Sequence, residues 1–412
     1  MHTWPAPALP ALGGTPPPLS LTDSADGFRT IHDGDSLRLW VCGITPYDAT
    51  HLGHANTYVA FDTLARTWLD GGRSLTYAQN LTDIDDPLFE RAEATNVVWH
   101  ELAAEQTDLF RSDMEALRVL PPDSWTSISE KLDDLEAAVR RLEESGTAYR
   151  LANEDGTEDV YADLSRDPEF ATAPCFAPLD LAAEFDDKGG DSERPGKRTA
   201  LDPIIWKGVR GDDFRPADGK PGSWRPGWHI ECALIALDEM GGIDVQGGGS
   251  DLLFPHHEMS EAHLREFGVD EPVRTHFHSG MVAFDGTKMS KSLGNLVLVS
   301  RLLADGIDAR AIRLAILANH PRSDWEYTDD VLHAAQARLD RWGSALNAPV
   351  NGNRMAPSAP YILERVRAAL ADDLDTPAAL AAVDQILPEV FGLESDREEV
   401  RAIIDALLGV AL

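Results

Sequence analysis

The spacing of apolar residues predicts a strand, a turn, a helix and a second strand near the start of the chain. Residues 37–42 alternate apolar and polar positions and lead into Gly43, which predicts a strand entering a turn. Apolar residues then recur at helical spacing over residues 58–69, and residues 75–78 read as a strand. This order begins an α/β fold with a parallel sheet, in which ligands bind at the carboxyl ends of strands.

The same spacing divides the rest of the chain. Helical patterns cover residues 99–118 and 128–145, and strands are predicted at 242–245 and 275–282. Residues 150–200 are rich in Asp, Pro and Gly, which favours an insertion or flexible loop between two halves of the sheet. The pattern is helical from about residue 300 to the end. The first 35 residues show little periodicity, and we expect them to cross the surface as an irregular arm.

Composition indicates an intracellular globular protein. The chain has 412 residues, 43% of them hydrophobic, so it can bury more than one core. We expect it to be soluble and cytoplasmic, because no run of eighteen apolar residues occurs and the proline-rich start does not resemble a signal peptide. Cys42, Cys175 and Cys232 are the only cysteines, a sparse and odd set that suits a reducing compartment.

The net charge argues against a nucleic-acid partner. Asp and Glu number 70 against 36 Lys and Arg, which gives a formal charge of −34. Such a field repels phosphate backbones, whose binding depends on Lys and Arg. Residues 331–412 contain seven Arg and no Lys against twelve acidic residues, a poor surface for RNA.

Two short motifs far apart in the chain carry the candidate chemistry. His51 and His54 lie at the start of a predicted helix, where the dipole and free backbone N–H groups favour anions. Lys288 and Lys291, on a glycine-flanked loop, would neutralise charge on a leaving pyrophosphate. Alone, the histidine motif could be two capping or surface histidines, and the lysine motif could be a solvated basic loop. Together they are typical of an enzyme that binds the triphosphate of ATP.

Cys42, Cys232 and His256 are candidate zinc ligands. Three protein ligands leave one position open, as in zinc sites that accept a substrate group. Inert buried cysteines are the alternative. Adjacent His256 and His257 would point about 100° apart on a helix, so only one should reach the metal.

Two further features lie near these ligands. The glycine-rich residues 247–251 follow a strand and would let backbone approach a nucleotide closely. Trp228, four residues before Cys232, could wall a small pocket, although an isolated Trp would be a core residue. Cys175 has no visible partner and is interpreted as structural.

These motifs resemble those of class I cysteinyl-tRNA synthetases. The resemblance runs from about residue 39 to about residue 395. It is carried by residues 41–45, 51–54, 80–86, 227–232, 247–258, 278–281, 288–295 and 372–377.

The resemblance implies specific roles. In that family zinc binds the thiol of cysteine and the two signature motifs bind ATP with Mg²⁺. This implies one Zn²⁺ on Cys42, Cys232 and His256, and catalytic roles for His51, His54, Lys288 and Lys291. The implied contacts to substrate or adenylate are Cys42, Gly43, Ile44, Thr45, Thr57, Asn80, Leu81, Thr82, Trp228, Gly249, Ser250, Asp251 and Val282.

The chain departs from the synthetases at two places. Ser260 stands where they supply a fourth zinc ligand, a Glu, so that either the adjacent Glu261 or the substrate thiolate would complete the shell. The chain also stops where they continue into an anticodon-recognising module. Both departures resemble the synthetase relatives that ligate cysteine in mycothiol biosynthesis, and residues 187–192 match the insert motif of those ligases loosely.

The expected function is therefore that of an ATP-dependent ligase. It would form cysteinyl-AMP and transfer cysteine to the amine of glucosaminyl-inositol. The alternatives are a truncated cysteinyl-tRNA synthetase and a non-catalytic regulator that binds zinc and a nucleotide. The expected partners are ATP, L-cysteine and glucosaminyl-inositol, with no nucleic acid and no membrane, and the chain is expected to act as a monomer.

The expected fold is a class I synthetase Rossmann-like parallel sheet with a connective insertion and a C-terminal helical domain. We predict an arm over residues 1–35, the two halves of the catalytic domain over 36–130 and 201–285, a connective insertion over 131–200, a signature-loop and stem-contact region over 286–330, and a helical domain over 331–412.

Overall fold

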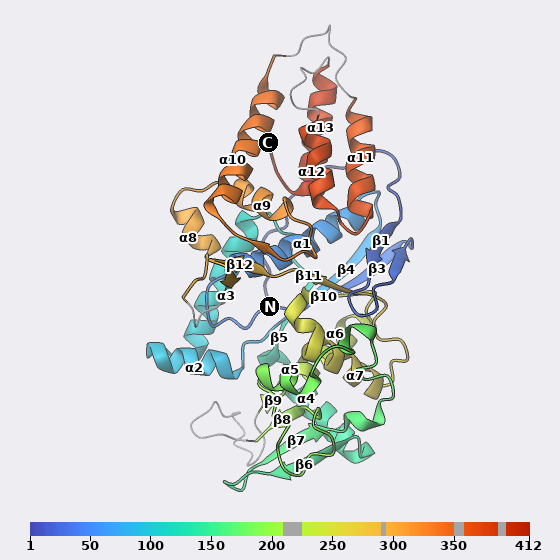
Figure 1. Ribbon diagram of the computed structural model, residues 1–412, viewed down its shortest axis with the longest axis vertical. Coiled ribbons are helices and arrows are strands. Elements are labelled where there is room, and N and C mark those ends of the chain that lie inside the picture. Colours follow the sequence, from blue (N-terminus) through green and yellow to red (C-terminus); the bar gives the residue numbers. More distant parts are fainter. Residues whose placement is uncertain (209–224, 290–293, 350–357, 386–392) are drawn as a thin grey trace.

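A five-stranded parallel sheet forms the centre of the molecule (Figure 1). The computed structural model describes residues 1–208, 225–289, 294–349, 358–385 and 393–412. In spatial order the strands are β11 (His276–Ser279), β10 (Val245–Gly249), β3 (Ser36–Val41), β4 (Ser74–Leu81) and β5 (Ser124–Ser127). The chain adds strands to one side of β3 and later to the other, so the order reverses between β3 and β10. Such a switch point leaves a crevice at the carboxyl ends of the strands, and the predicted parallel α/β sheet is confirmed.

Helix α1 (Leu52–Leu69) links the sheet to the C-terminal helices. It packs against β4, β10 and β11 on one side and against α9, α11 and α13 on the other, so most of its residues are buried. The C-terminal helices, which lie at the top of Figure 1, are α8 (Val299–Ala304), α9 (Ala309–Leu317), α10 (Asp329–Asn347), α11 (Ala359–Ala371), α12 (Thr376–Asp384) and α13 (Glu394–Leu408). The predicted helical C-terminal region is confirmed.

A buried ion cluster joins α1 to these helices. The Asp62 carboxylate accepts a 2.7 Å hydrogen bond from Arg66 Nε and pairs with Arg313 of α9. Arg313 Nε also donates to the carbonyl of Leu408, at the end of α13, over 2.6 Å. Burial alone would raise the pKa of Asp62, but the charges of Arg313 and Arg66 outweigh it and hold that pKa below its usual value. The carboxylate is therefore ionised and fully paired.

Residues 148–207, part of which was expected to be an insertion or flexible loop, contain paired strands that were not predicted. Together with β9 they form a four-stranded antiparallel sheet, seen at the bottom of Figure 1. Its strands are β6 (Ala148–Ala152), β7 (Glu158–Ala162), β8 (Ile204–Lys207) and β9 (Arg225–Pro226). The Asp-rich composition predicts a loop, but several of these carboxylates instead bind neighbouring chain segments. Buried Asp202, for example, accepts hydrogen bonds from Tyr149 Oη at 2.6 Å and from the Leu164 N–H at 3.1 Å.

The N-terminal arm is mostly exposed or half-buried, as a surface path predicts, but single residues anchor it in the core. Trp4 is only 3% exposed, and its indole N–H donates to the carbonyl of Val119 over 2.7 Å. Its ring meets Phe110 and Trp125 edge-on, both at 5.7 Å between centroids. Further along, β1 (Leu19–Thr22) and β2 (Arg29–His32) form an antiparallel pair. Trp4, together with Leu19 and Leu21 of β1, thus fixes the arm to the rest of the molecule.

The strand predicted over residues 275–282 is two strands in different sheets. It breaks after β11 at Gly280, where a Cβ would lie 2.2 Å from the Ser323 carbonyl. The second part belongs to a small sheet of β12 (Val282–Phe284), β13 (Thr287–Lys288) and β14 (Trp325–Glu326). The remaining helices are α2 (Asp86–Thr95), α3 (Trp99–Ala116), α4 (Ile128–Ser145), α5 (Leu181–Asp187), α6 (Trp228–Met240) and α7 (Glu258–Glu266). None of the helices described has the length and apolar content that a membrane span requires.

Candidate active site

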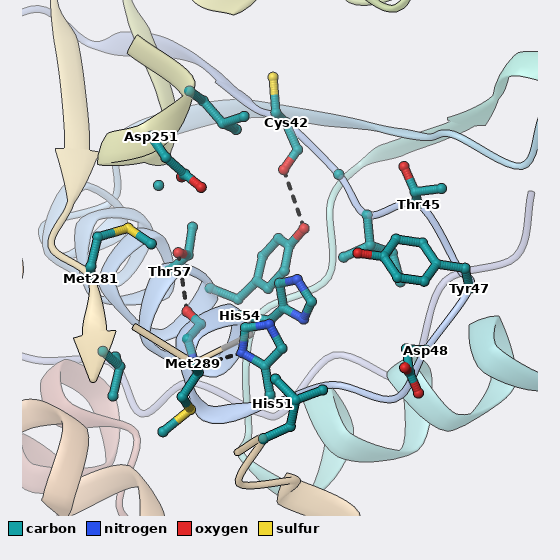
Figure 2. A pocket seen from close by; sticks show the side chains of 18 of the residues that line it. Cys42, Thr45, Tyr47, Asp48, His51, His54, Thr57, Asp251, Met281 and Met289 are labelled. Carbon is teal, nitrogen blue, oxygen red and sulfur yellow. Dashed lines mark hydrogen bonds between the residues drawn. The ribbon is translucent and has the colours of Figure 1, made fainter. Parts of the chain in front are cut away.

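A cavity of about 410 Å³ lies at the carboxyl ends of the central strands (Figure 2). The segments that follow β3, β10 and β11 all contribute to its lining. Gly43 is required where the chain leaves β3, because a Cβ there would lie 1.7 Å from the carbonyl oxygen of Asn80. Its N–H donates to Asn80 Oδ1 over 2.8 Å, which fixes the Asn80 side chain at the cavity. This is where ligands bind in open α/β folds.

His51 and His54 form a stacked pair at the start of α1. Their ring centroids are 3.9 Å apart and the planes differ by 25°. His51 caps the helix, because its Nδ1 accepts the N–H of Gly53 over 3.0 Å. A neutral His51 therefore carries its proton on Nε2, as a donor. Burial, together with the charge that His51 carries when protonated, holds the pKa of His54 well below its usual value, so His54 is neutral.

The helix start is tied to the segment that follows the lysine motif. The Leu52 N–H donates to the Val297 carbonyl over 2.9 Å, and the Val299 N–H donates to the Thr50 carbonyl over 3.0 Å. An antiparallel bridge pairs His51 with Leu298 between them. These backbone bonds hold together two regions that are about 240 residues apart in the sequence.

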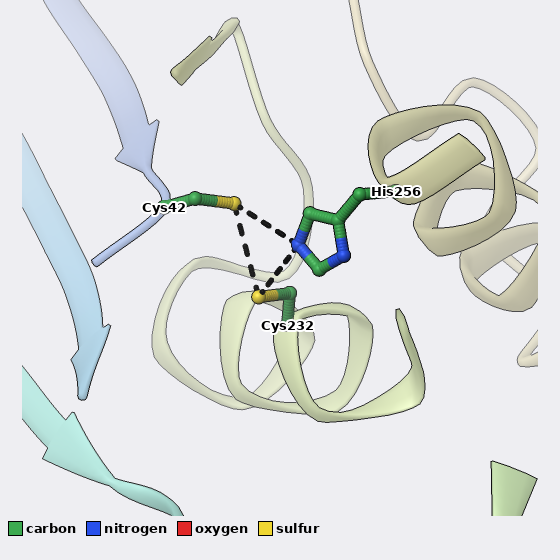
Figure 3. A group of neighbouring side chains, drawn as sticks. All are labelled: Cys42, Cys232 and His256. Carbon is green, nitrogen blue, oxygen red and sulfur yellow. Dashed lines mark hydrogen bonds between the residues drawn. The ribbon is translucent and has the colours of Figure 1, made fainter. Parts of the chain in front are cut away.

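Cys42, just after the carboxyl end of β3, meets Cys232 of α6 and His256, as Figure 3 shows. The two Sγ atoms are 3.8 Å apart, and His256 Nε2 lies 3.4 Å from Cys42 Sγ and 3.3 Å from Cys232 Sγ. All three residues are buried, and within the described ranges they are the one group of this kind that could hold a metal ion.

The electrostatics of the two thiols differ. Burial raises the pKa of Cys42, but the hydrogen bond to Cys232 and the nearby imidazoles of His257 and His256 outweigh it and lower that pKa well below the usual value. Burial and the neighbouring Cys42 raise the pKa of Cys232 well above its usual value. Without a cation the pair therefore keeps one proton. A divalent cation would stabilise both thiolates, and two thiolates with one imidazole suit zinc.

Neither Ser260 nor Glu261 lies in this cluster. Ser260 Oγ donates to the carbonyls of His256 and His229, at 2.7 and 3.0 Å. Glu261 binds Arg265 with one carboxylate oxygen, at 2.7 Å, and His276 with the other, at 2.9 Å. Both side chains are thus engaged elsewhere.

His257 and Trp228 surround the cluster without belonging to it. His257 Nε2 lies 3.0 Å from Cys42 Sγ, while its Nδ1 lies 2.6 Å from His278 Nε2. Trp228 stacks on the His256 ring at 4.0 Å between centroids and also lines the cavity. The tryptophan thus separates the buried His256 from the open space.

Most of the residues expected to contact substrate lie together around this cavity. Those that line it are Cys42, Gly43, Ile44, Thr45, His51, His54, Thr57, Asn80, Trp228, Cys232, Gly249, Asp251 and Val282. Leu81 is buried in the core, and Thr82 lies beneath Asn80, whose Nδ2 donates to its hydroxyl over 3.0 Å. Ser250 faces a neighbouring cavity. Lys288 belongs to β13, and Lys291 lies outside the described residues.

Several lining residues were not predicted. They are Tyr47, Asp48, Gly53, Tyr58, Leu252, Gly280, Met281, Met289 and Leu296. Tyr58 could have been found, because it lies four residues after His54 on the same face of α1. Its hydroxyl donates to the Cys42 carbonyl over 3.2 Å. The others are brought to the cavity by tertiary packing.

Known proteins are similar to this chain in sequence and in fold. Residues 28–337 match the family described as tRNA synthetases class I (C) catalytic domain. A solved structure, Mycobacterium tuberculosis methionyl-tRNA synthetase in complex with methionyl-adenylate, is similar with a TM-score of 0.64 and 19% identity, over 91% of this chain and 92% of that one.

Full-length relatives are more similar. The L-cysteine:1D-myo-inositol 2-amino-2-deoxy-alpha-D-glucopyranoside ligase of Cellulomonas flavigena is 53% identical over the whole of both chains. The ligase of the same name from Streptomyces coelicolor is 48% identical, also over the whole of both chains. The chain therefore belongs to the class I synthetase family and, within it, to the family of L-cysteine:1D-myo-inositol 2-amino-2-deoxy-alpha-D-glucopyranoside ligases.

Proposed function

We propose that the protein is an ATP-dependent ligase that activates L-cysteine as cysteinyl-AMP and transfers it to the amine of glucosaminyl-inositol, which is 1D-myo-inositol 2-amino-2-deoxy-alpha-D-glucopyranoside. The names of its full-length relatives support this substrate pair. The observation that carries the proposal is one cavity lined by both the two thiols, Cys42 and Cys232, and the histidine pair, His51 and His54.

Cysteine activation needs donors at the phosphates. In this step a carboxylate oxygen of cysteine attacks the α-phosphorus of ATP, the bond from that phosphorus to the bridging oxygen breaks, and pyrophosphate leaves with the bonding pair. His51 Nε2–H and the amino end of α1 are the donors we assign to the phosphates, because both are already oriented by the helix cap. We assign Lys288 and Lys291 to the pyrophosphate, with Mg²⁺ bound to ATP.

Amide formation needs the acceptor amine beside the activated carbonyl. The amine nitrogen attacks the carbonyl carbon of cysteinyl-AMP, the bond from that carbon to the phosphate oxygen breaks, and AMP leaves with the bonding pair. The amine loses one proton to solvent. Asp251 lines the cavity and is our candidate to hold the amine before the attack (Figure 2).

We assign one zinc ion to Cys42, Cys232 and His256. When bound, zinc would favour cysteine over serine, because a thiolate is a far better ligand than a hydroxyl. Since Ser260 and Glu261 are engaged elsewhere, the substrate thiolate is the fourth donor that we propose. Trp228 would then close the pocket around the cysteine side chain.

The decisive experiment supplies cysteine and ATP with either glucosaminyl-inositol or tRNA and follows AMP. We expect rapid AMP release and an amide product with the sugar, and slow consumption with tRNA. Cysteine-dependent exchange of pyrophosphate into ATP should occur without any acceptor. Efficient charging of tRNA with no amide on the sugar would instead identify a truncated synthetase. Absence of exchange would favour the non-catalytic regulator.

A further inference from the structure

A second cavity of about 270 Å³ adjoins the first, and Asp251 lines both. Its walls come from the segment 175–188 of the insertion, which includes α5, and from the segment 250–254 that follows β10. Ligand cavities in proteins measure roughly 300 to 1,000 Å³. At about 270 Å³ this cavity is slightly smaller, which suits a small ligand such as a sugar. Asp251 is thus a wall that the two cavities share.

The lining of the second cavity combines an aromatic floor with mixed polar groups. Phe176 and Phe254 are buried, and their ring centroids are 5.4 Å apart. Glu184, Lys188 and Ser250 also line the cavity. A polyhydroxylated ring offers apolar C–H faces together with hydroxyls that both donate and accept. This lining matches those features.

The charges disfavour a phosphate-bearing ligand. The Lys188 ammonium already lies 3.1 Å from the Asp187 carboxylate. Two carboxylates, Glu184 and Asp251, line the same small space. A phosphate group would be repelled there, whereas a neutral polyol that carries one amine would be accepted.

We propose that the second cavity binds the sugar and inositol rings of the acceptor and presents its amine at Asp251 to the adenylate in the first cavity. The inference rests on the proposed function. It also gives a role to residues 187–192, because Lys188 belongs to that motif. Cysteine activation needs the first cavity alone, so changes in the second should affect the amide-forming step only.

Two variants test this assignment in the full-length, metal-loaded enzyme. Glu184→Gln removes a charged acceptor from the cavity, and Leu179→Trp fills it from a position that is 41% exposed, so neither change disturbs a buried core. Glu193→Gln is the matched control, since Glu193 lies on the same insertion, is exposed and does not line the cavity.

We expect both cavity variants to raise the KM for glucosaminyl-inositol on the order of 10-fold, as for loss of a charge-assisted hydrogen bond. Pyrophosphate exchange should stay unchanged, as should AMP release with hydroxylamine, an amine that carries no sugar. The control should match wild type throughout. Normal acceptor KM values in both variants would overturn the assignment of the second cavity alone. Failure of the wild-type enzyme to form the amide would overturn the proposed function and this inference with it.

Discussion

Cys232 supplies one of the two thiols of the proposed zinc site, and it is 1% exposed. We expect Cys232→Ala to lose zinc and cysteine-dependent pyrophosphate exchange, because two ligands hold the ion poorly. Metal analysis of the purified variant and an exchange assay check this. Cys175→Ala, which changes a cysteine outside the cluster, should retain its zinc. A full zinc complement with normal exchange in Cys232→Ala would disprove the ligand assignment.

Lys291 is assigned to the charge that develops on pyrophosphate. We expect Lys291→Ala to slow adenylation on the order of 10²-fold or more, the usual effect of removing a preorganised donor. The melting temperature should hardly change. Single-turnover measurement of cysteinyl-AMP formation and a thermal melt separate the two effects. Near-normal turnover would remove this loop from the mechanism.

At the residue scale, the sequence motifs contain most of the residues that line the first cavity, at the ends of the central strands. Cys42, His51 and Asp251 were expected at one site because each follows or lies near the carboxyl end of a strand or the start of a helix. Leu81 is the last residue of β4, and its side chain lies in the core instead of lining the cavity. Whether Glu261 completes the zinc shell in place of Ser260 could not be predicted from the sequence. The answer depends on the tertiary structure, in which Glu261 binds Arg265 and His276.

At the scale of helices, Asp62 connects α1 to the C-terminal helices. Removing one member of a buried ion cluster leaves the others unpaired, so we expect Asp62→Ala to cost about 3–5 kcal/mol of unfolding free energy. Denaturant titration measures this. The partly exposed pair of Arg118 and Asp405 is the control, and Asp405→Asn should cost about 0–1 kcal/mol. Equal losses in the two variants would contradict the central role of Asp62.

His276 holds the N-terminal arm and α7 against the sheet through Asp23 and Glu261. Burial lowers the pKa of His276, but the two carboxylates outweigh it and raise that pKa to about 10. The protonated ring therefore stabilises the fold fully below its ordinary pKa of 6.5, and this contribution is lost as the pH rises toward 10. We expect unfolding free energy to fall over this window in wild type and to fall less in His276→Gln. His333→Gln, at an exposed position, should behave like wild type.

Elements with strong periodicity were predicted, and those fixed by tertiary contacts were not. The sheet and the C-terminal helices follow from apolar spacing. The anchoring of the arm was not predicted, because a few separate residues, Trp4, Leu19 and Leu21, make too short a pattern to be recognised. The antiparallel sheet of the insertion was not predicted, because an Asp-rich sequence is typical of loops. In the structure these carboxylates bind partners such as Tyr149, which the sequence does not identify.

At the scale of the whole molecule, the charge of −34 means that salt dependence can distinguish a polyanionic acceptor from a neutral one. A protein that binds a phosphate backbone loses about 10³–10⁵ in affinity between 50 and 200 mM salt. A neutral sugar with one amine should be almost insensitive. We expect kcat/KM for glucosaminyl-inositol to change less than about threefold over that range. Titration with salt at fixed ATP and cysteine checks this, and a steep decline would point to a polyanionic acceptor.

The bonds between Thr50, Leu52, Val297 and Val299 are made by backbone atoms alone. Mutation changes side chains and leaves such bonds in place. Replacements at 297–299 that the surrounding core accepts therefore keep the histidine motif next to the segment that follows the lysine motif. Proline at position 299 is the exception, because it lacks the N–H that donates to Thr50. The two halves of the proposed ATP site are thus aligned by bonds between backbone atoms.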